Sequence, residues 1–193
     1  MPRIERDSLL SLEAYARERK DIRARVIEHK KNRTLQLGDS VTLIFEDEQT
    51  IRYQIQEMLR VERIFEEDGI RDELDTYNPL VPDGSNFKAT MMLEFPDPLE
   101  RATWLAKLIG IEDKTWVQVD GYERVWAVAD EDLDRETEAK TSSVHFLRFE
   151  LEAEMVRALK DGAGLSLGID HPEYHAIAKA PAAVRAALVQ DLA

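Results

Sequence analysis

Apolar residues between Ile51 and Phe65 recur with the spacing of an α-helix. At 100° per residue they form one stripe, made of Ile51, Ile55, Met58, Leu59 and Phe65. Glu62 falls near the middle of that stripe. A buried carboxylate is costly unless it is paired, and otherwise it tends to protonate. The pattern therefore predicts a helix that carries one acidic side chain on its buried face.

Glu62 has two interpretations. In the first it forms a buried ion pair with Arg19, which interrupts the apolar stripe of the first helix, or with Arg148. We favour this interpretation, because buried ion pairs more often fix the register of helices than catalyse reactions. In the second it is a metal ligand or a general acid or base. Neither applies if residues 50–56 form a strand, because the helical projection then fails.

The first helix is expected to begin at a cap formed by Asp7 or Ser8 and to run to about Asn32. Its length would be on the order of 37 Å, which is long for a domain of this size. A helix of that length would lie across a sheet or pair with another helix, and it offers a surface for a homodimer.

Alternating apolar residues predict strands. Phe87 to Phe95 places Lys88 and Glu94 together on the less apolar face, and Ser142 to Leu151 separates His145 from Arg148. Asp120-Gly121 predicts a two-residue hairpin turn with Val119 opposite Tyr122. Five strands and five or six helices without a βαβ repeat favour an α+β fold, a twisted and mainly antiparallel sheet covered by helices with a long N-terminal helix. We expect one domain over residues 1–193, with a possible subdivision in the charged segment 130–140.

Candidate chemistry is sparse. His171 and His175 have the i, i+4 spacing of a helical metal site, but Pro172 makes that context poor. A lone histidine such as His145 is usually a satisfied core residue. Joined by Glu62 and another carboxylate it could instead ligate iron or manganese. The candidate pocket consists of Glu62, His145, Arg148, Lys88, Glu94 and Arg19.

Charge and composition narrow the partners. The net charge of −13 argues against nonspecific binding of nucleic acid. Residues 17–33 hold eight Lys and Arg against three acids, a local charge of +5 that leaves −18 elsewhere. The chain has no cysteine, so it offers no thiolate for an iron–sulfur cluster or a zinc site. No secretory signal and no apolar run of membrane-spanning length is present, so a cytoplasmic protein is expected.

Three segments carry a resemblance: YQIQEMLRVERIF, LVPDGSNFKATMMLEF and KTSSVHFLRFEL. With LEAYARERKDIRARVIEHKKNR near the start, the chain resembles an uncharacterised bacterial domain-of-unknown-function family of the DUF 3501 type over nearly its whole length. The resemblance implies gene neighbours that encode a rubrerythrin-like protein and an iron–sulfur oxidoreductase. It therefore implies an accessory or interaction protein in a redox or oxidative-stress pathway. The alternative is an enzyme or ligand-binding protein with a His/Glu site, holding a non-haem metal or none.

Overall fold

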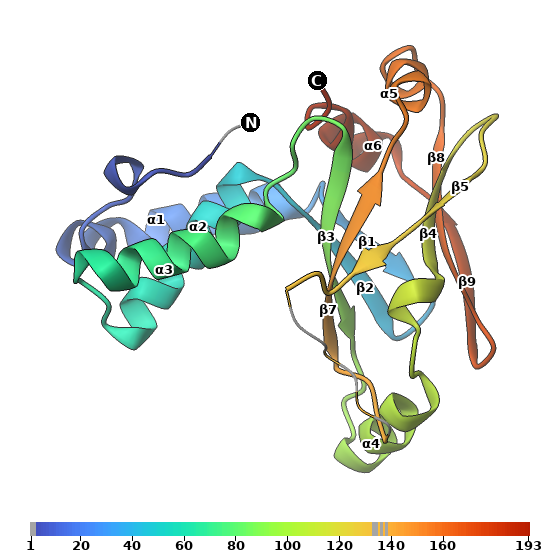
Figure 1. Ribbon diagram of the computed structural model, residues 1–193, viewed down its shortest axis with the longest axis horizontal. Helices are drawn as coiled ribbons and strands as arrows, with labels where there is room; N and C mark the ends of the chain where they lie inside the picture. Colours follow the sequence, from blue (N-terminus) through green and yellow to red (C-terminus); the bar gives the residue numbers. More distant parts are fainter. Residues whose placement is uncertain (1–2, 133–134, 136, 138) are drawn as a thin grey trace.

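The structure is a computed structural model, and it describes residues 3–132, 135, 137 and 139–193. The described strands form two sheets in which every pairing is antiparallel (Figure 1). The first sheet has the order β1 (Thr34–Leu37), β2 (Val41–Glu46), β3 (Asn86–Leu93), β7 (Val144–Glu150), β6 (Val128–Ala129). The second has the order β5 (Arg124–Trp126), β4 (Thr115–Val119), β8 (Leu165–His171), β9 (Tyr174–Lys179).

Helices surround the sheets unevenly. Three of them lie together on one side of the sheets in Figure 1: α1 (Leu12–Lys30), α2 (Glu48–Glu62) and α3 (Glu67–Tyr77). At the two ends of the strands lie α4 (Pro98–Lys107) and the pair α5 (Ala153–Lys160) and α6 (Ala182–Val189). Short 3-10 turns complete the described elements: η1 (Arg6–Ser8), η2 (Asn78–Leu80) and η3 (Glu112–Lys114).

The buried apolar side chains form two clusters. The larger one joins the facing sides of both sheets to α4, α5 and α6, and it includes Phe45, Phe149 and Leu167. The smaller one lies between α2, α3 and the N-terminal segment, around Ile55 and Ile70. Two sheets that each bury one face explain why the strands alternate between apolar and polar residues.

The predicted α+β class with antiparallel strands is confirmed, although the strands divide into two sheets. The N-terminal helix is present but shorter than expected, because it starts at Leu12 and has 19 residues. Ser11 caps it by accepting a hydrogen bond from the amide of Ala14. Residues 6–8 form η1 instead, and Leu9 turns into the smaller apolar cluster.

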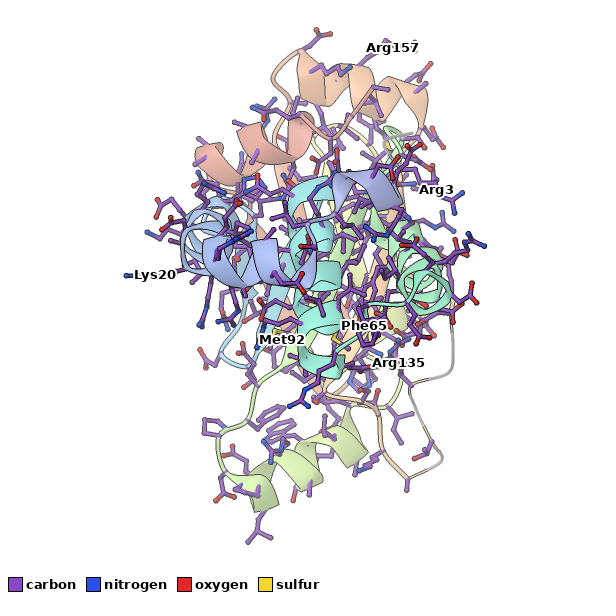
Figure 2. The ribbon with its side chains drawn as sticks, turned by 90° about the vertical axis from the view of Figure 1, so that its left-hand side faces the viewer. Arg3, Lys20, Phe65, Met92, Arg135 and Arg157 are labelled. Atoms are coloured by element: carbon purple, nitrogen blue, oxygen red, sulfur yellow. The ribbon has the colours of Figure 1, made fainter. Side chains whose placement is uncertain are left out.

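The prediction of a buried Glu62 is wrong. The helix α2 ends at this residue, and Arg63 follows in the left-handed conformation with φ 58°. Glu62 is therefore the last residue of the helix and is exposed, as is Phe65, which Figure 2 labels. The buried polar side chains on this helix are Thr50, in its first turn, and Gln56. The side-chain Oε1 of Gln56 accepts a hydrogen bond of 2.7 Å from the backbone amide of Leu10.

The expected pair between Arg19 and Glu62 is also wrong. Arg19 pairs with Glu57, five residues earlier on α2, through hydrogen bonds of 2.7 and 2.9 Å. The hydroxyl of Tyr15, which is fully buried, donates to the same carboxylate at 2.7 Å. An arginine does connect α1 to α2, but the acid lies five residues, or about 1.4 turns, closer to the start of α2 than the apolar stripe indicated.

Two further local predictions fail. The hairpin at Asp120-Gly121 is shifted by one residue, so that Val117 pairs with Val125, because only Gly121 of the two turn residues has a positive φ. A type I′ turn needs positive φ at both. His171 and His175 lie on the antiparallel strands β8 and β9, not on a helix.

No helix in the described part of the chain is both long enough and apolar enough to cross a membrane.

Candidate metal centre and adjoining cavity

The strand β7 separates two candidate sites, because its side chains alternate between two environments. His145, Leu147 and Phe149 are buried on one side, as the sequence pattern predicted. Phe146 and Arg148 point to the other side, where they line a cavity. His145 pairs in register with Met91 of β3, in the interior of the first sheet.

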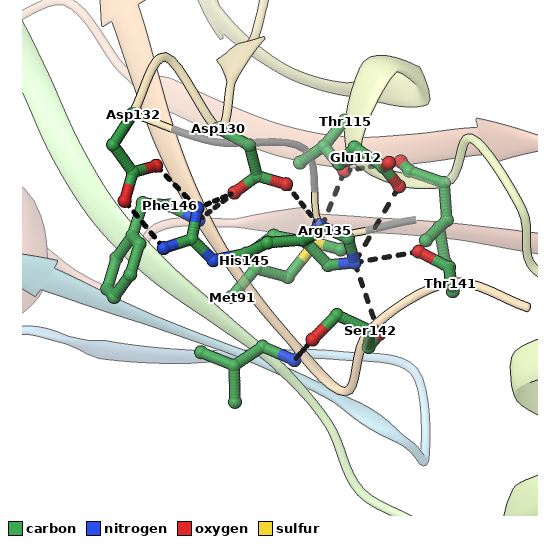
Figure 3. A network of polar contacts seen from close by, with 12 residues as sticks. Met91, Glu112, Thr115, Asp130, Asp132, Arg135, Thr141, Ser142, His145 and Phe146 are labelled. Carbon is green, nitrogen blue, oxygen red and sulfur yellow. Dashed lines mark hydrogen bonds and ion pairs between the residues drawn. The ribbon is translucent and has the colours of Figure 1, made fainter. Parts of the chain in front are cut away.

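His145 is fully buried, and both nitrogens of its ring have polar neighbours (Figure 3). Its Nδ1 lies 2.6 Å from Oδ2 of Asp130. Its Nε2 lies 2.9 Å from Oγ1 of Thr141 and 3.1 Å from the carbonyl oxygen of Ser142. The nearer carboxylate oxygen of Glu112 is 3.8 Å from Nε2. One donor atom each from Glu112, Asp130 and His145 lie within 4.8 Å of one another.

The backbone holds Asp130 firmly in place. Its amide donates to the carbonyl oxygen of Phe146 at 2.9 Å, and the amide of Phe146 donates back to Asp130 Oδ1 at 2.9 Å. Asp130 directly follows β6 and has a positive φ of 49°. Such a conformation is uncommon outside glycine and persists where the surroundings over-determine it, often at functional sites.

Arg135 covers the outer side of this aspartate. Its Nη1 lies 3.3 Å from Asp130 Oδ1, and its guanidinium stacks 4.6 Å from the ring centroid of Phe146. It also forms a bidentate ion pair with Asp132, drawn in Figure 3. Arg135 therefore lines the cavity on the far side of β7 and also contacts the carboxylate that holds the buried histidine.

Glu112 reaches the histidine from the opposite direction. It lies in η3, directly before β4, and only 5% of its surface is exposed. Thr115, at the start of β4, hydrogen-bonds the carbonyl of Ile111 at 3.0 Å and so closes the turn that carries Glu112. The centre is therefore assembled from a 3-10 turn, a strand end and a central strand that are far apart in the sequence.

The surroundings of His145 favour its charged form. Burial alone would lower the pKa of the imidazole, but the hydrogen bond to Asp130 and the negative charges of Glu112 and Asp130 outweigh it. The pKa is therefore raised above the ordinary value of 6.5. Both ring nitrogens can then act as donors, Nδ1 to Asp130 and Nε2 to the carbonyl of Ser142.

The cavity beside this centre has a volume of about 780 Å³. It lies between the outer side of β3 and β7, the end of α3 and the residues that follow β6. Lys88 of β3 and Arg148 of β7 line it and are cross-strand partners. Apolar walls come from Tyr77, Leu80 and Phe146.

The residues of the predicted pocket are thus divided among separate places. Lys88 and Arg148 share the cavity, and His145 lies on the opposite side of β7. Glu94 is exposed beyond the end of β3, where it accepts a hydrogen bond from Thr42. The remaining two, Glu62 and Arg19, belong to the helices α2 and α1, and the supposed partner Arg148 instead pairs with Glu131 and Glu150.

Sequence reasoning missed Glu112 and Asp130. Both belong to a chain with 39 acids, and nothing in their spacing distinguishes them from solvated residues. Asp130 begins the charged segment 130–140, where the sequence predicted a possible subdivision of the domain. Residues 133, 134, 136 and 138 lie outside the described part, whereas the side chains of Asp130 and Arg135 are only 9% and 15% exposed. The only available sequence signal for this site was Asp130 itself, an acid that directly follows an apolar run and begins the charged segment 130–140.

Fold and site together describe an α+β protein with a buried histidine–carboxylate cluster next to a cavity. The chain belongs to the family described as "Protein of unknown function (DUF3501)", whose model matches residues 3–192. It is also similar to a crystal structure described as a novel protein of unknown function from Burkholderia pseudomallei K96243. The two chains are 54% identical over 100% of each, with a TM-score of 0.95. No curated protein matches the chain.

Proposed function

We propose that this protein binds a divalent metal ion of the iron, manganese or zinc type at His145 and Glu112, with Asp130 orienting the histidine. The observation that carries the proposal is the meeting of one imidazole and two carboxylates inside the molecule, within 4.8 Å of one another. An imidazole with carboxylate oxygens suits these ions, and the ligand set contains no thiolate.

Distances around His145 Nε2 fit a coordination shell. Two donor atoms in cis positions of an ion with bonds of about 2.1 Å lie about 3.0 Å apart, and trans donors about 4.2 Å apart. From Nε2, Thr141 Oγ1 lies at 2.9 Å, the carbonyl of Ser142 at 3.1 Å and Glu112 at 3.8 Å. These oxygen atoms come from three residues and surround the same nitrogen.

Asp130 has the position of an orienting carboxylate. At 2.6 Å from Nδ1 it accepts the proton of that nitrogen, which leaves the lone pair on Nε2 for an ion. Histidine ligands of metals commonly make this second hydrogen bond to a carboxylate. The other carboxylate oxygen of Asp130 accepts a hydrogen bond from the amide of Phe146, so the backbone of β7 fixes the carboxylate that orients the imidazole ring.

Metal binding must compete with a proton at this site. Because the pKa of His145 is raised, a proton competes with the ion for this imidazole more strongly than it would at an ordinary histidine. Affinity for the ion should therefore rise with pH, and binding should release protons. A purely structural histidine–aspartate pair would show neither effect.

The first experiment is elemental analysis of the untagged protein, followed by anaerobic titration with Fe²⁺, Mn²⁺ and Zn²⁺. We expect nearly one ion per chain, and a large loss in both His145→Gln and Glu112→Gln. The matched control is His175→Gln, because His175 is exposed and also pairs with an aspartate, Asp170, at 3.0 Å. The proposal would be overturned if the protein bound less than about a tenth of an ion per chain in the titration with each of the three ions.

A second candidate function is the accessory role in a redox or oxidative-stress pathway. The observation that favours it is the outer surface of α1, where Arg17, Lys20, Arg23 and Arg25 are exposed. Complementary charge accelerates and orients the docking of an acidic partner such as a rubrerythrin-like protein or an iron–sulfur oxidoreductase. Reversing two of these charges should abolish co-purification with such a partner, and binding unchanged by both salt and charge reversal would contradict this role.

A further inference from the structure

The cavity on the outer side of β7 contains chemistry that the metal centre does not use. Its volume of about 780 Å³ falls within the range of small-molecule sites, about 300–1,000 Å³. Its floor is the outward side of β3 and β7, and Tyr77, Pro79 and Leu80 form the opposite wall. The cavity thus combines an apolar wall with a floor and rim that carry charged side chains.

Lys88 is the unusual group in this floor. It is half-buried, and it makes no hydrogen bond or ion pair with any residue in the described part of the chain. Its cross-strand partner Arg148 takes both neighbouring carboxylates, Glu131 at 2.8 Å and Glu150 at 2.7 Å. The lysine therefore lies beside a guanidinium that has already engaged the nearest counterions.

This environment disfavours the charged form of the amine. Burial lowers the pKa of Lys88, and the positive charge of Arg148 lowers it further. Glu131, Asp83 and Glu150 act in the opposite direction but do not reverse the shift. Desolvation and a neighbouring cation are the two means by which proteins activate lysine amines as nucleophiles.

We propose that Lys88 forms a Schiff base with the aldehyde or ketone group of a small apolar carbonyl compound bound in this cavity. The neutral Nζ attacks the carbonyl carbon, and one proton passes from the nitrogen to the carbonyl oxygen to give a carbinolamine. The hydroxyl then takes up a second proton, the C–O bond breaks and water leaves as the nitrogen lone pair forms the C=N bond, and the iminium nitrogen gives up its remaining proton. No electrons are exchanged with an outside reagent.

The cavity supplies what each step needs. Glu131 and Glu150 lie at the floor with Lys88 and can pass protons between nitrogen and oxygen. The rings of Tyr77 and Phe146 and the side chain of Leu80 offer apolar contact for the carbon skeleton of the ligand. The carboxylates that line the cavity outnumber its cations, so the cavity disfavours an anionic ligand and leaves an uncharged carbonyl compound as the better fit.

The test uses the intact wild-type protein with propanal or benzaldehyde and a borohydride reagent, which reduces a Schiff base to a stable secondary amine. Peptide mapping by mass spectrometry then compares Lys88 with the exposed Lys160 in the same sample. We expect Lys88 to be labelled at least ten times faster. Labelling no faster than that of Lys160 would overturn the proposal.

Variants and competition sharpen the result. Lys88→Met should lose the fast label whereas Lys160→Met keeps it, and Lys88→Arg serves if the methionine variant fails to fold. Protection of Lys88 by acetate or phosphate, without any reductive label, would show a plain anion site and would refute the Schiff base. The result is independent of metal content, because the proposed metal centre lies on the other side of β7.

Discussion

Glu57 links α2 to α1, and its replacement by glutamine tests whether its pairing with Arg19 stabilises the fold. The hydrogen bonds from Arg19 hold the pKa of this carboxyl at about 2, against 4.5 ordinarily; burial opposes them, and Tyr15 and Arg60 assist. A shift of about 2.5 units corresponds to roughly 3 kcal/mol. This value is an upper limit, because solvent reaches 31% of the Arg19 side chain and 19% of that of Glu57.

The sign of the pH dependence follows from the direction of the shift. Because the folded state lowers the pKa of Glu57, its stabilisation is fully present above pH 4.5 and is lost as the pH falls towards 2. Urea unfolding should therefore show that Glu57→Gln costs up to roughly 3 kcal/mol at pH 7 and less than half of that at pH 3.

Glu62→Gln is the matched control for this experiment. It makes the same change on the same helix, but at an exposed position, and should alter the free energy of unfolding by less than about 0.5 kcal/mol. The reasoning is refuted if Glu62→Gln proves the costlier change, or if the cost of Glu57→Gln is the same at both pH values.

Three further predictions concern other buried groups. Arg33 is 2% exposed and pairs with Asp191, so Arg33→Met should lower the free energy of unfolding by about 3–5 kcal/mol. The deficit in urea unfolding should shrink from pH 8 to pH 5, because burial raises the pKa of Asp191 to about 6. In the metal-free protein, the stabilisation by charged His145 should be complete below pH 6.5 and should disappear as the pH rises through its raised pKa. A pH series of thermal melts measures this loss of stability, and the same loss in His145→Gln would contradict the prediction. Gly168→Ala places a methyl group 2.3 Å from Trp116 and should lower stability by about 1–3 kcal/mol, whereas an unchanged melting temperature would mean that the indole can shift freely.

Much of the local structure was predictable from the sequence. Alternation of apolar and polar residues correctly placed β3 and β7 and assigned His145 and Arg148 to opposite faces. Successive side chains of a strand point to opposite faces of the sheet, so burial of one face leaves an alternating pattern within a short stretch of sequence. Helix ends were less predictable, because Ser8 and Ser11 are equally good caps, and only the packing of Leu9 into the smaller apolar cluster selects Ser11.

The sequence by itself determined the α+β class, the antiparallel strands, the absence of thiolate chemistry and the placement of a histidine inside a strand. Tertiary structure alone decided which acids meet that histidine, because Glu112, Asp130 and His145 come from elements separated by up to 33 positions, and no local period connects them. It also decided that Glu57, not Glu62, pairs with Arg19. A helical projection gives the angle of a side chain around the helix axis, but the neighbouring helix determines where along the axis that face is covered.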